Sequence, residues 1–123
     1  VYAYAEGRFD RDRAAAAARD MMASAAPPDA IFVANDHMAL GVLDELRHGL
    51  GIDVPGEVAI VGYDDVPAAA WKAYDLTTVR QPVARMVAAT VDTLLAEIEG
   101  GAPPGRVTEI AAELVPRSST RAV

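Results

Sequence analysis

Three side chains stand out because each follows a short apolar run and each could bind a small polar molecule. They are Phe9, Asn35 and Asp64. The amide of Asn35 both donates and accepts hydrogen bonds, and the ionised carboxylate of Asp64 accepts hydroxyl hydrogens. The aromatic ring of Phe9 could stack on the apolar face of a sugar or on a base. This combination predicts reversible binding of a small polar ligand.

Each of these positions also has a purely structural interpretation. Asn35 has two open roles, as a ligand contact or as the N-cap of the helix that follows it. For Asp36 the pattern favours the N-cap, and for Asp65 it favours a turn or cap residue. Phe9 is either a ligand contact or a loop residue folded onto the core.

Strands and helices that alternate along the chain must position these residues. An apolar run over residues 30–34 stops at Asn35 and is followed by a helical pattern over 36–48. A second apolar run, 58–63, stops at Asp64, and a first strand over residues 1–5 precedes Phe9. Because parallel strands end at the same edge of a sheet, we expect the three side chains to face one cleft.

The remaining pattern completes an α/β fold. Asp10 is a suitable N-cap for a helix that ends near residue 24, and Pro82 suits the first turn of a long helix. That helix has apolar residues at helical spacing, namely Val83, Val87, Val91, Leu94, Leu95 and Ile98. We also expect a short helix over 67–73 and strands over 76–80, 107–110 and 113–116. Such alternation predicts right-handed crossovers and a mainly parallel sheet.

Composition excludes several classes of function. The 123 residues fit one domain and include no cysteine, which rules out disulfides and Cys-based metal sites. Two histidines without neighbouring ligands make a metal centre unexpected. The formal charge of −7 and a single lysine argue against DNA binding by this segment itself. No apolar run is long enough to cross a membrane. We expect no cofactor.

Enzyme motifs are also missing. The chain has no Gly-x-Gly-x-x-Gly fingerprint, no phosphate-binding loop with lysine and no Gly-x-Ser-x-Gly elbow. Asp64 and Asp65 could in principle hold Mg²⁺, but a phosphorylated receiver of this architecture would need a lysine where Arg80 stands. We therefore predict a protein without catalytic residues.

Several stretches, in order and at family spacing, resemble the C-terminal part of the effector domain of LacI/GalR-family transcriptional regulators. They are Glu6-Gly7-Arg8-Phe9, residues 28–41 with Ala34-Asn35-Asp36-His37-Met38-Ala39-Leu40-Gly41, residues 54–65 ending in Gly62-Tyr63-Asp64-Asp65, Leu76-Thr77-Thr78-Val79-Arg80-Gln81-Pro82, and residues 113–120. The resemblance covers essentially the whole chain.

This resemblance implies a parallel-sheet lobe of the type I periplasmic-binding-protein kind, with helices on both faces, forming part of a two-lobed effector-binding and dimerisation domain. It implies that a small effector, a sugar or a nucleobase, contacts Phe9, Asn35 and Asp64 between the lobes, while Asp36 caps the helix. It further implies a cytoplasmic homodimer whose operator DNA is bound by a helix-turn-helix headpiece that lies outside residues 1–123, as does the N-terminal lobe.

The competing hypothesis is a periplasmic sugar-binding protein that serves an uptake transporter. Such a protein has the same fold and a similar site, so upstream sequence is the discriminator. A secretory leader would favour transport, and a helix-turn-helix would favour regulation. The stretches 35–41 and 76–82 favour the regulator.

Overall fold

The computed structural model describes residues 3–100 and 107–121. It divides into two compact units, which we describe separately. Unit 1 comprises residues 1–80 and 114–123, and unit 2 comprises residues 81–113. The chain therefore leaves unit 1 after Arg80 and returns to it at Leu114.

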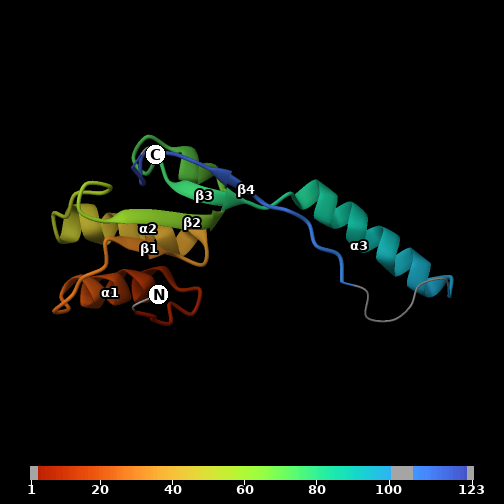
Figure 1. Cartoon of the computed structure of the whole chain (residues 1–123), viewed down its shortest axis with the longest axis horizontal. Helices are drawn as coiled ribbons and strands as arrows, with labels where there is room; N and C mark the ends of the chain where they lie inside the picture. Colours follow the sequence, from red (N-terminus) through yellow and green to blue (C-terminus); the bar gives the residue numbers. More distant parts are fainter. Residues whose placement is uncertain (1–2, 101–106, 122–123) are drawn as a thin grey trace. The chain divides into compact units, whose positions relative to one another are not determined.

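A four-stranded sheet forms the centre of unit 1 (Figure 1). Its strands are β1 (Ala30–Phe32), β2 (Ala59–Asp64), β3 (Thr77–Arg80) and β4 (Glu113–Val115), in that order across the sheet. Strands β1 and β2 are parallel, with Phe32 opposite Val61, and β2 and β3 are parallel, with Asp64 opposite Arg80. The predicted α/β class with a mainly parallel sheet is confirmed.

Helices α1 (Arg11–Met22) and α2 (Asp36–Asp44) pack beside this sheet. Helix α2 contacts β2, and α1 contacts α2. Asp10 is the N-cap of α1, as predicted, because its carboxylate accepts the Arg13 N–H at 2.8 Å. A π-helical turn, η1 (Glu45–Gly49), continues α2, and a short 3₁₀ helix, η2 (Pro67–Ala70), follows β2.

The hydrophobic core of unit 1 lies between α2 and the sheet. Its largest fully buried apolar side chains are Leu43, Leu46, Val58, Ile60 and Leu76. Each lies in a predicted helix or strand, and burying one such side chain contributes roughly 1.5–3 kcal/mol. This core fixes α2, whose N-cap is Asn35, and β2, whose last residue is Asp64.

The segment after β4 is held against the sheet by hydrogen bonds of the buried Ser119 hydroxyl. Ser119 Oγ accepts the Thr77 N–H at 2.8 Å and donates to the Ile60 carbonyl at 2.6 Å. The Ser119 carbonyl in turn accepts the Ile60 N–H at 2.8 Å. Because backbone groups buried without partners are costly, these bonds secure the segment that follows β4.

Unit 2 contains α3 (Val83–Ile98), which begins directly after Pro82, as predicted. The helix has no side-chain N-cap bond and none of its residues is buried. Its large apolar residues keep sizeable exposed fractions, from 39% at Met86 to 79% at Ile98. The predicted face is present, and within unit 2 no described residue covers it.

Two of the predicted strands are wrong. Residues 3–5 and 107–110 have no strand conformation, although residues 113–115 do. A strand needs a hydrogen-bonded neighbour, and an apolar sequence alone does not supply one. The short helix predicted over 67–73 is confirmed in part, as η2. Residues 1–2 of the first predicted strand lie outside the described residues.

Candidate functional site

Asn35 lies at the start of α2, three residues after the end of β1. Its Oδ1 accepts the Met38 N–H at 2.8 Å, so Asn35 is the N-cap of this helix. The side chain is half-buried. The amide oxygen is thus used by the helix cap, so the Nδ2 group is the donor available to a ligand. The capping interpretation is confirmed for Asn35, and it is compatible with a binding role.

Asp36 does not cap the helix, and this corrects the prediction. Its carboxylate is fully buried, and it accepts the Thr78 hydroxyl at 2.6 Å and the Val66 N–H at 2.9 Å. Gly62 makes room for it, since a Cβ at that position would collide with the carboxylate of Asp36. Asp36 therefore joins α2 to Val66, just after β2, and to Thr78 in β3. These partners are 30 and 42 positions away in the sequence.

Asp64 is the last residue of β2, and Asp65 follows it. Both have left-handed backbone conformations, with φ of 118° and 56°. The Asp65 carboxylate accepts Arg80 Nε at 2.6 Å and Arg117 Nη2 at 2.6 Å. Burial raises the pKa of Asp65, but the hydrogen bonds from Arg117 and Arg80 outweigh it, so this pKa lies below its ordinary value. Asp65 is an ion-paired residue rather than a simple turn residue.

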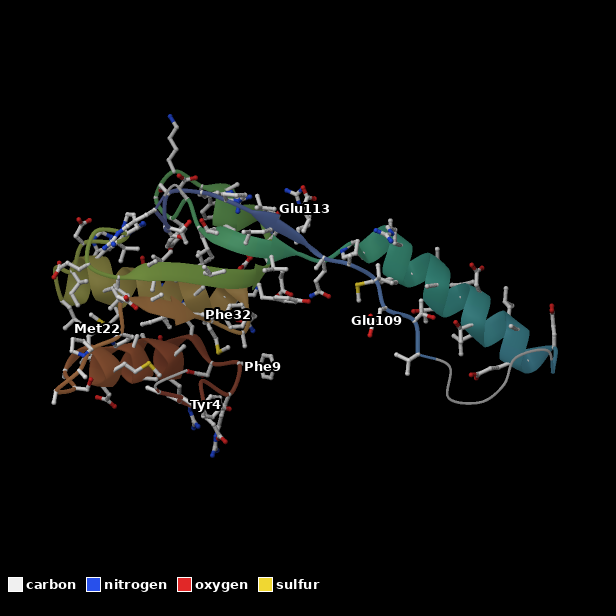
Figure 2. All side chains as sticks on the ribbon, viewed as in Figure 1. Tyr4, Phe9, Met22, Phe32, Glu109 and Glu113 are labelled. Atoms are coloured by element: carbon white, nitrogen blue, oxygen red, sulfur yellow. The ribbon has the colours of Figure 1, made fainter. Side chains whose placement is uncertain are left out.

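Phe9 lies in the loop before α1. It has φ of 56°, directly after Arg8 with φ of 51°, and its side chain is 81% exposed. Figure 2 shows Phe9 and Phe32 near the end of unit 1 toward which β2 points. The alternative that Phe9 folds onto the core is wrong.

The sheet brings Asn35 and Asp64 to the same edge. Asn35 follows the carboxyl end of β1, and Asp64 is the last residue of the adjacent parallel strand β2. Just after β1, the Val33 N–H donates to the Val61 carbonyl at 2.8 Å. Phe9 comes from a loop instead, because the strand predicted before it does not form. The edge therefore offers an amide donor and a carboxylate, with an exposed aromatic ring carried by a separate segment.

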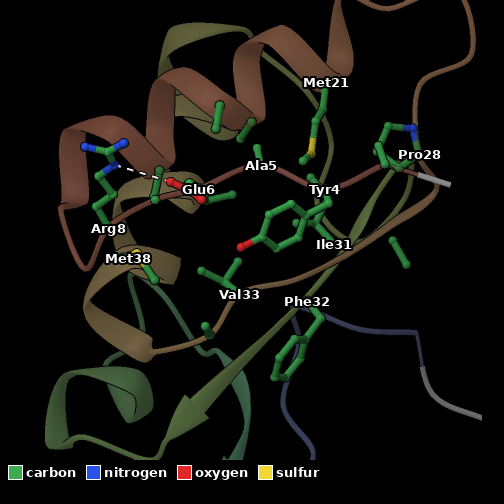
Figure 3. A pocket seen from close by; sticks show the side chains of 18 of the residues that line it. Tyr4, Ala5, Glu6, Arg8, Met21, Pro28, Ile31, Phe32, Val33 and Met38 are labelled. Atoms are coloured by element: carbon green, nitrogen blue, oxygen red, sulfur yellow. Dashed lines mark hydrogen bonds and ion pairs between the residues drawn. The ribbon is translucent and has the colours of Figure 1, made fainter. Parts of the chain in front are cut away.

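An apolar groove of about 840 Å³ lies between the N-terminal segment, α1 and β1 (Figure 3). Figure 3 shows the Tyr4 ring pointing toward Ile31 and Val33. Phe9 also lines this groove, but Asn35 and Asp64 do not. The groove is therefore distinct from the polar edge of the sheet, and Phe9 is the one predicted site residue in contact with it.

Arg117 has a structural role that the sequence alone did not reveal. Its guanidinium donates to the Leu76 carbonyl at 2.7 Å as well as to Asp65, and its side chain is only 13% exposed. A basic residue in a tail of small polar residues, Arg117-Ser118-Ser119-Thr120, was the available signal. Its partner, 52 positions earlier, was not apparent from local sequence.

Within residues 3–100 and 107–121, no group of three or more potential metal-binding side chains lies together. Among the helices of the same residues, none has the length and apolar character needed to cross a membrane.

Comparison with known families gives a match over nearly the whole chain. The model of the periplasmic binding protein-like domain matches residues 1–120. Among curated proteins, the HTH-type transcriptional regulator MalR of Streptomyces coelicolor is 47% identical over 91 residues, which cover 74% of this chain and 26% of that protein.

Solved structures give the same result. A LacI-type transcription regulator from Bifidobacterium animalis subsp. lactis superimposes with a TM-score of 0.79 at 38% identity, covering 91% of this chain and 40% of that one. A LacI family regulator from Arthrobacter sp. FB24 in complex with lactose gives 0.77 at 31% identity, covering 90% and 41%. The chain thus spans well under half the length of the proteins it matches.

Proposed function

Because this chain belongs to the family of periplasmic binding protein-like domains, in the form that LacI-type transcriptional regulators carry, we propose that it binds a small polar effector at the carboxyl edge of its sheet. The observation that carries this proposal is the position of Asn35, which follows β1, and of Asp64, which is the last residue of the adjacent parallel strand β2. Ligands of open α/β sheets bind at this edge.

Each of the three residues has a separate proposed role. The Nδ2 of Asn35 donates to an oxygen of the effector, since its Oδ1 is held by the Met38 N–H. The Asp64 carboxylate accepts hydroxyl hydrogens, and the exposed Phe9 ring stacks on an apolar face of the ligand. Such a set suits a sugar or a nucleobase, and the lactose complex of the Arthrobacter regulator favours a sugar.

The wider proposal is regulatory rather than catalytic. Effector binding would shift an equilibrium between two states of a cytoplasmic homodimer, and the operator affinity of a DNA-binding headpiece would follow that shift. The relatives named above are regulators, which supports this proposal over a transport function. Sedimentation velocity of the chain would test the dimer directly, because a purely monomeric species at high concentration would contradict it.

The binding site can be tested by titrating lactose, sucrose and guanosine into the chain by calorimetry. We use Asn35→Ser rather than Asn35→Ala, because serine retains the helix cap and removes only the amide donor. Asn35→Ser, Asp64→Asn and Phe9→Ala should each weaken binding by about tenfold or more, the scale of a lost hydrogen bond to a charged group or of a lost stacking partner.

Matched controls separate the sheet edge from the rest of unit 1. Tyr4→Ala removes an aromatic ring that is as exposed as Phe9, at 83%, and Asp53→Asn removes a carboxylate from a distant turn. Both should leave the affinity unchanged. Equal losses in the control and site variants, or unchanged affinity in all three site variants, would overturn the assignment.

A further inference from the structure

Two successive residues with side chains, Asp64 and Asp65, have left-handed backbone conformations at the end of β2. Their φ angles are 118° and 56°. Residues other than glycine adopt such angles at a cost in free energy, and they keep them only where surrounding contacts determine the backbone. The question is therefore which contacts hold this pair.

Asp65 makes two of the contacts that hold this turn. Both of its carboxylate oxygens are used, Oδ1 by Arg117 Nη2 and Oδ2 by Arg80 Nε, each at 2.6 Å. Only 9% of its side chain is exposed. On the following residue, the Val66 N–H donates to the buried Asp36 carboxylate at 2.9 Å. The turn after Asp64 is thus anchored from two directions.

The two arginines occupy particular places in the chain. Arg80 ends β3 and is the last residue of unit 1 before the chain enters residues 81–113. Arg117 lies three positions after Leu114, where the chain returns, and it also donates to the Leu76 carbonyl at 2.7 Å. One carboxylate therefore ties together the outgoing and the returning segment of unit 1.

We propose that Asp65 is a positioning residue, whose paired carboxylate fixes the left-handed backbone of Asp64 and thereby sets the direction of the Asp64 side chain at the sheet edge. The same ion pairs connect that backbone to both segments that join unit 1 to unit 2. The use of Asp64 for ligand binding rests on the proposed function, whereas the control of its backbone by Asp65 does not.

Asp65→Asn is the decisive variant. Asparagine adopts left-handed conformations at least as readily as aspartate, so a change at Asp64 reports the lost charge and not an altered local preference. The backbone is read by NMR of the full chain, from the one-bond Cα–Hα coupling of Asp64, which is sensitive to the sign of φ. Asp65→Asn should move this coupling toward the value of an extended residue. It should also accelerate amide exchange of the neighbouring Val66 by about tenfold, because the turn loses the charged hydrogen bonds from Arg117 and Arg80 while the bond from Val66 to Asp36 remains.

A matched control separates positioning from general loss of stability. Glu45 also has an ion pair, to Arg19 at 2.8 Å, and its hydrogen bond from Arg19 lowers its pKa, but that pair joins η1 to α1. Glu45→Gln should leave the coupling of Asp64 unchanged. If Asp65→Asn leaves the Asp64 coupling at its original value, or if Glu45→Gln moves it equally, the proposal is overturned.

Variants of the partners provide a second route should Asp65→Asn fail to fold. Arg117→Gln should shift the Asp64 coupling more than Arg80→Gln, because the Arg117 side chain is 13% exposed and that of Arg80 is 49% exposed. Exposed ion pairs contribute less than buried ones. A shift from neither substitution would contradict the proposal.

Titrating lactose into the same variants tests whether the backbone conformation of Asp64 affects ligand affinity. Asp65→Asn should weaken lactose binding by about tenfold without touching the ligand, in parallel with the shift at Asp64. Unaltered affinity with a shifted coupling would overturn the link to the ligand. Absence of lactose binding in the unsubstituted chain would count against the proposed sugar effector alone, since the coupling at Asp64 decides the role of Asp65 independently.

Discussion

Helices α2 and α3 are both apolar, yet they occupy opposite environments. Seven of the nine residues of α2 are buried, including Leu43 at 0% exposure, whereas none of the sixteen residues of α3 is buried. Leu94 in the middle of α3 is 53% exposed. The difference shows that an apolar helical period marks a face suited to burial without specifying the surface that covers it.

The contrast extends to the polar ends of the two helices. Asn35 caps α2, and the fully buried carboxylate of Asp36 accepts hydrogen bonds from Thr78 and Val66. This helix start is therefore part of the buried interior of unit 1. Helix α3 begins at Pro82 with no side-chain cap. The candidate site residue Asn35 thus lies at the start of α2, which tertiary hydrogen bonds hold in place, and not at the start of α3.

Leucine truncation should separate the two helices most clearly. Leu43→Ala removes a fully buried side chain of α2 and should lower the free energy of unfolding by roughly 2–5 kcal/mol, the usual range for a core leucine. Leu94→Ala in α3 is the matched control and should change it by less than about 0.5 kcal/mol. Urea unfolding followed by circular dichroism measures both. Similar losses would show that α3 is covered in the chain in solution.

Removing the buried carboxylate of α2 should have the next largest effect. Asp36→Ala leaves the Thr78 hydroxyl and the Val66 N–H without their acceptor, which should cost about 1–3 kcal/mol of unfolding free energy. Asp92→Ala, on the exposed α3, is the comparison and should have little effect. Thermal unfolding of the two variants gives the answer, and equal melting temperatures would contradict the role given to Asp36.

The cap of α2 can be tested with two substitutions at one position. Asn35→Ala removes the acceptor for the Met38 N–H and should destabilise unit 1 by about 1 kcal/mol, whereas Asn35→Ser should recover most of this loss. The readout is amide exchange at Met38. If serine and alanine accelerate exchange equally, Asn35 does not act through its side-chain oxygen.

Acidification should produce the smallest effect, and one confined to unit 1. The pKa of Asp65 is lowered in the folded chain. A carboxyl of this kind stabilises the fold above its unfolded pKa, and this contribution is lost as the pH falls through its folded pKa. The melting temperatures of the unsubstituted chain and Asp65→Asn should therefore differ at pH 7 and converge well below about pH 4. If the melting temperatures of the two proteins still differ in acid, the stabilising effect of Asp65 comes from the packing of its side chain and not from its charge.

Local sequence patterns predicted most of the regular structure, because the determinants of helices lie within a few residues of one another. The Asp10 cap, the Pro82 start and the runs that became β2 and β3 all follow from neighbouring residues. The same reasoning failed for residues 3–5 and 107–110, where strand formation depends on a distant partner.

At the start of α2, the sequence predicted a helix cap but placed it on the wrong one of two adjacent residues. Asn35 and Asp36 are adjacent and both are good capping residues; the local pattern favoured Asp36 as the cap, whereas the structure has Asn35 in that role. Their roles are decided by Thr78 and Val66, which the fold brings to the carboxylate of Asp36 and not to the amide of Asn35.

The sequence by itself thus determined the fold class, the family and the strand ends at which polar residues gather. Tertiary structure alone decided which of two adjacent side chains is buried, which acid pairs with Arg80 and Arg117, and which apolar helix face is covered. These outcomes depend on contacts between residues that are dozens of positions apart in the sequence. The energies of such contacts are set by burial and geometry, so they produce no periodic pattern in the local sequence.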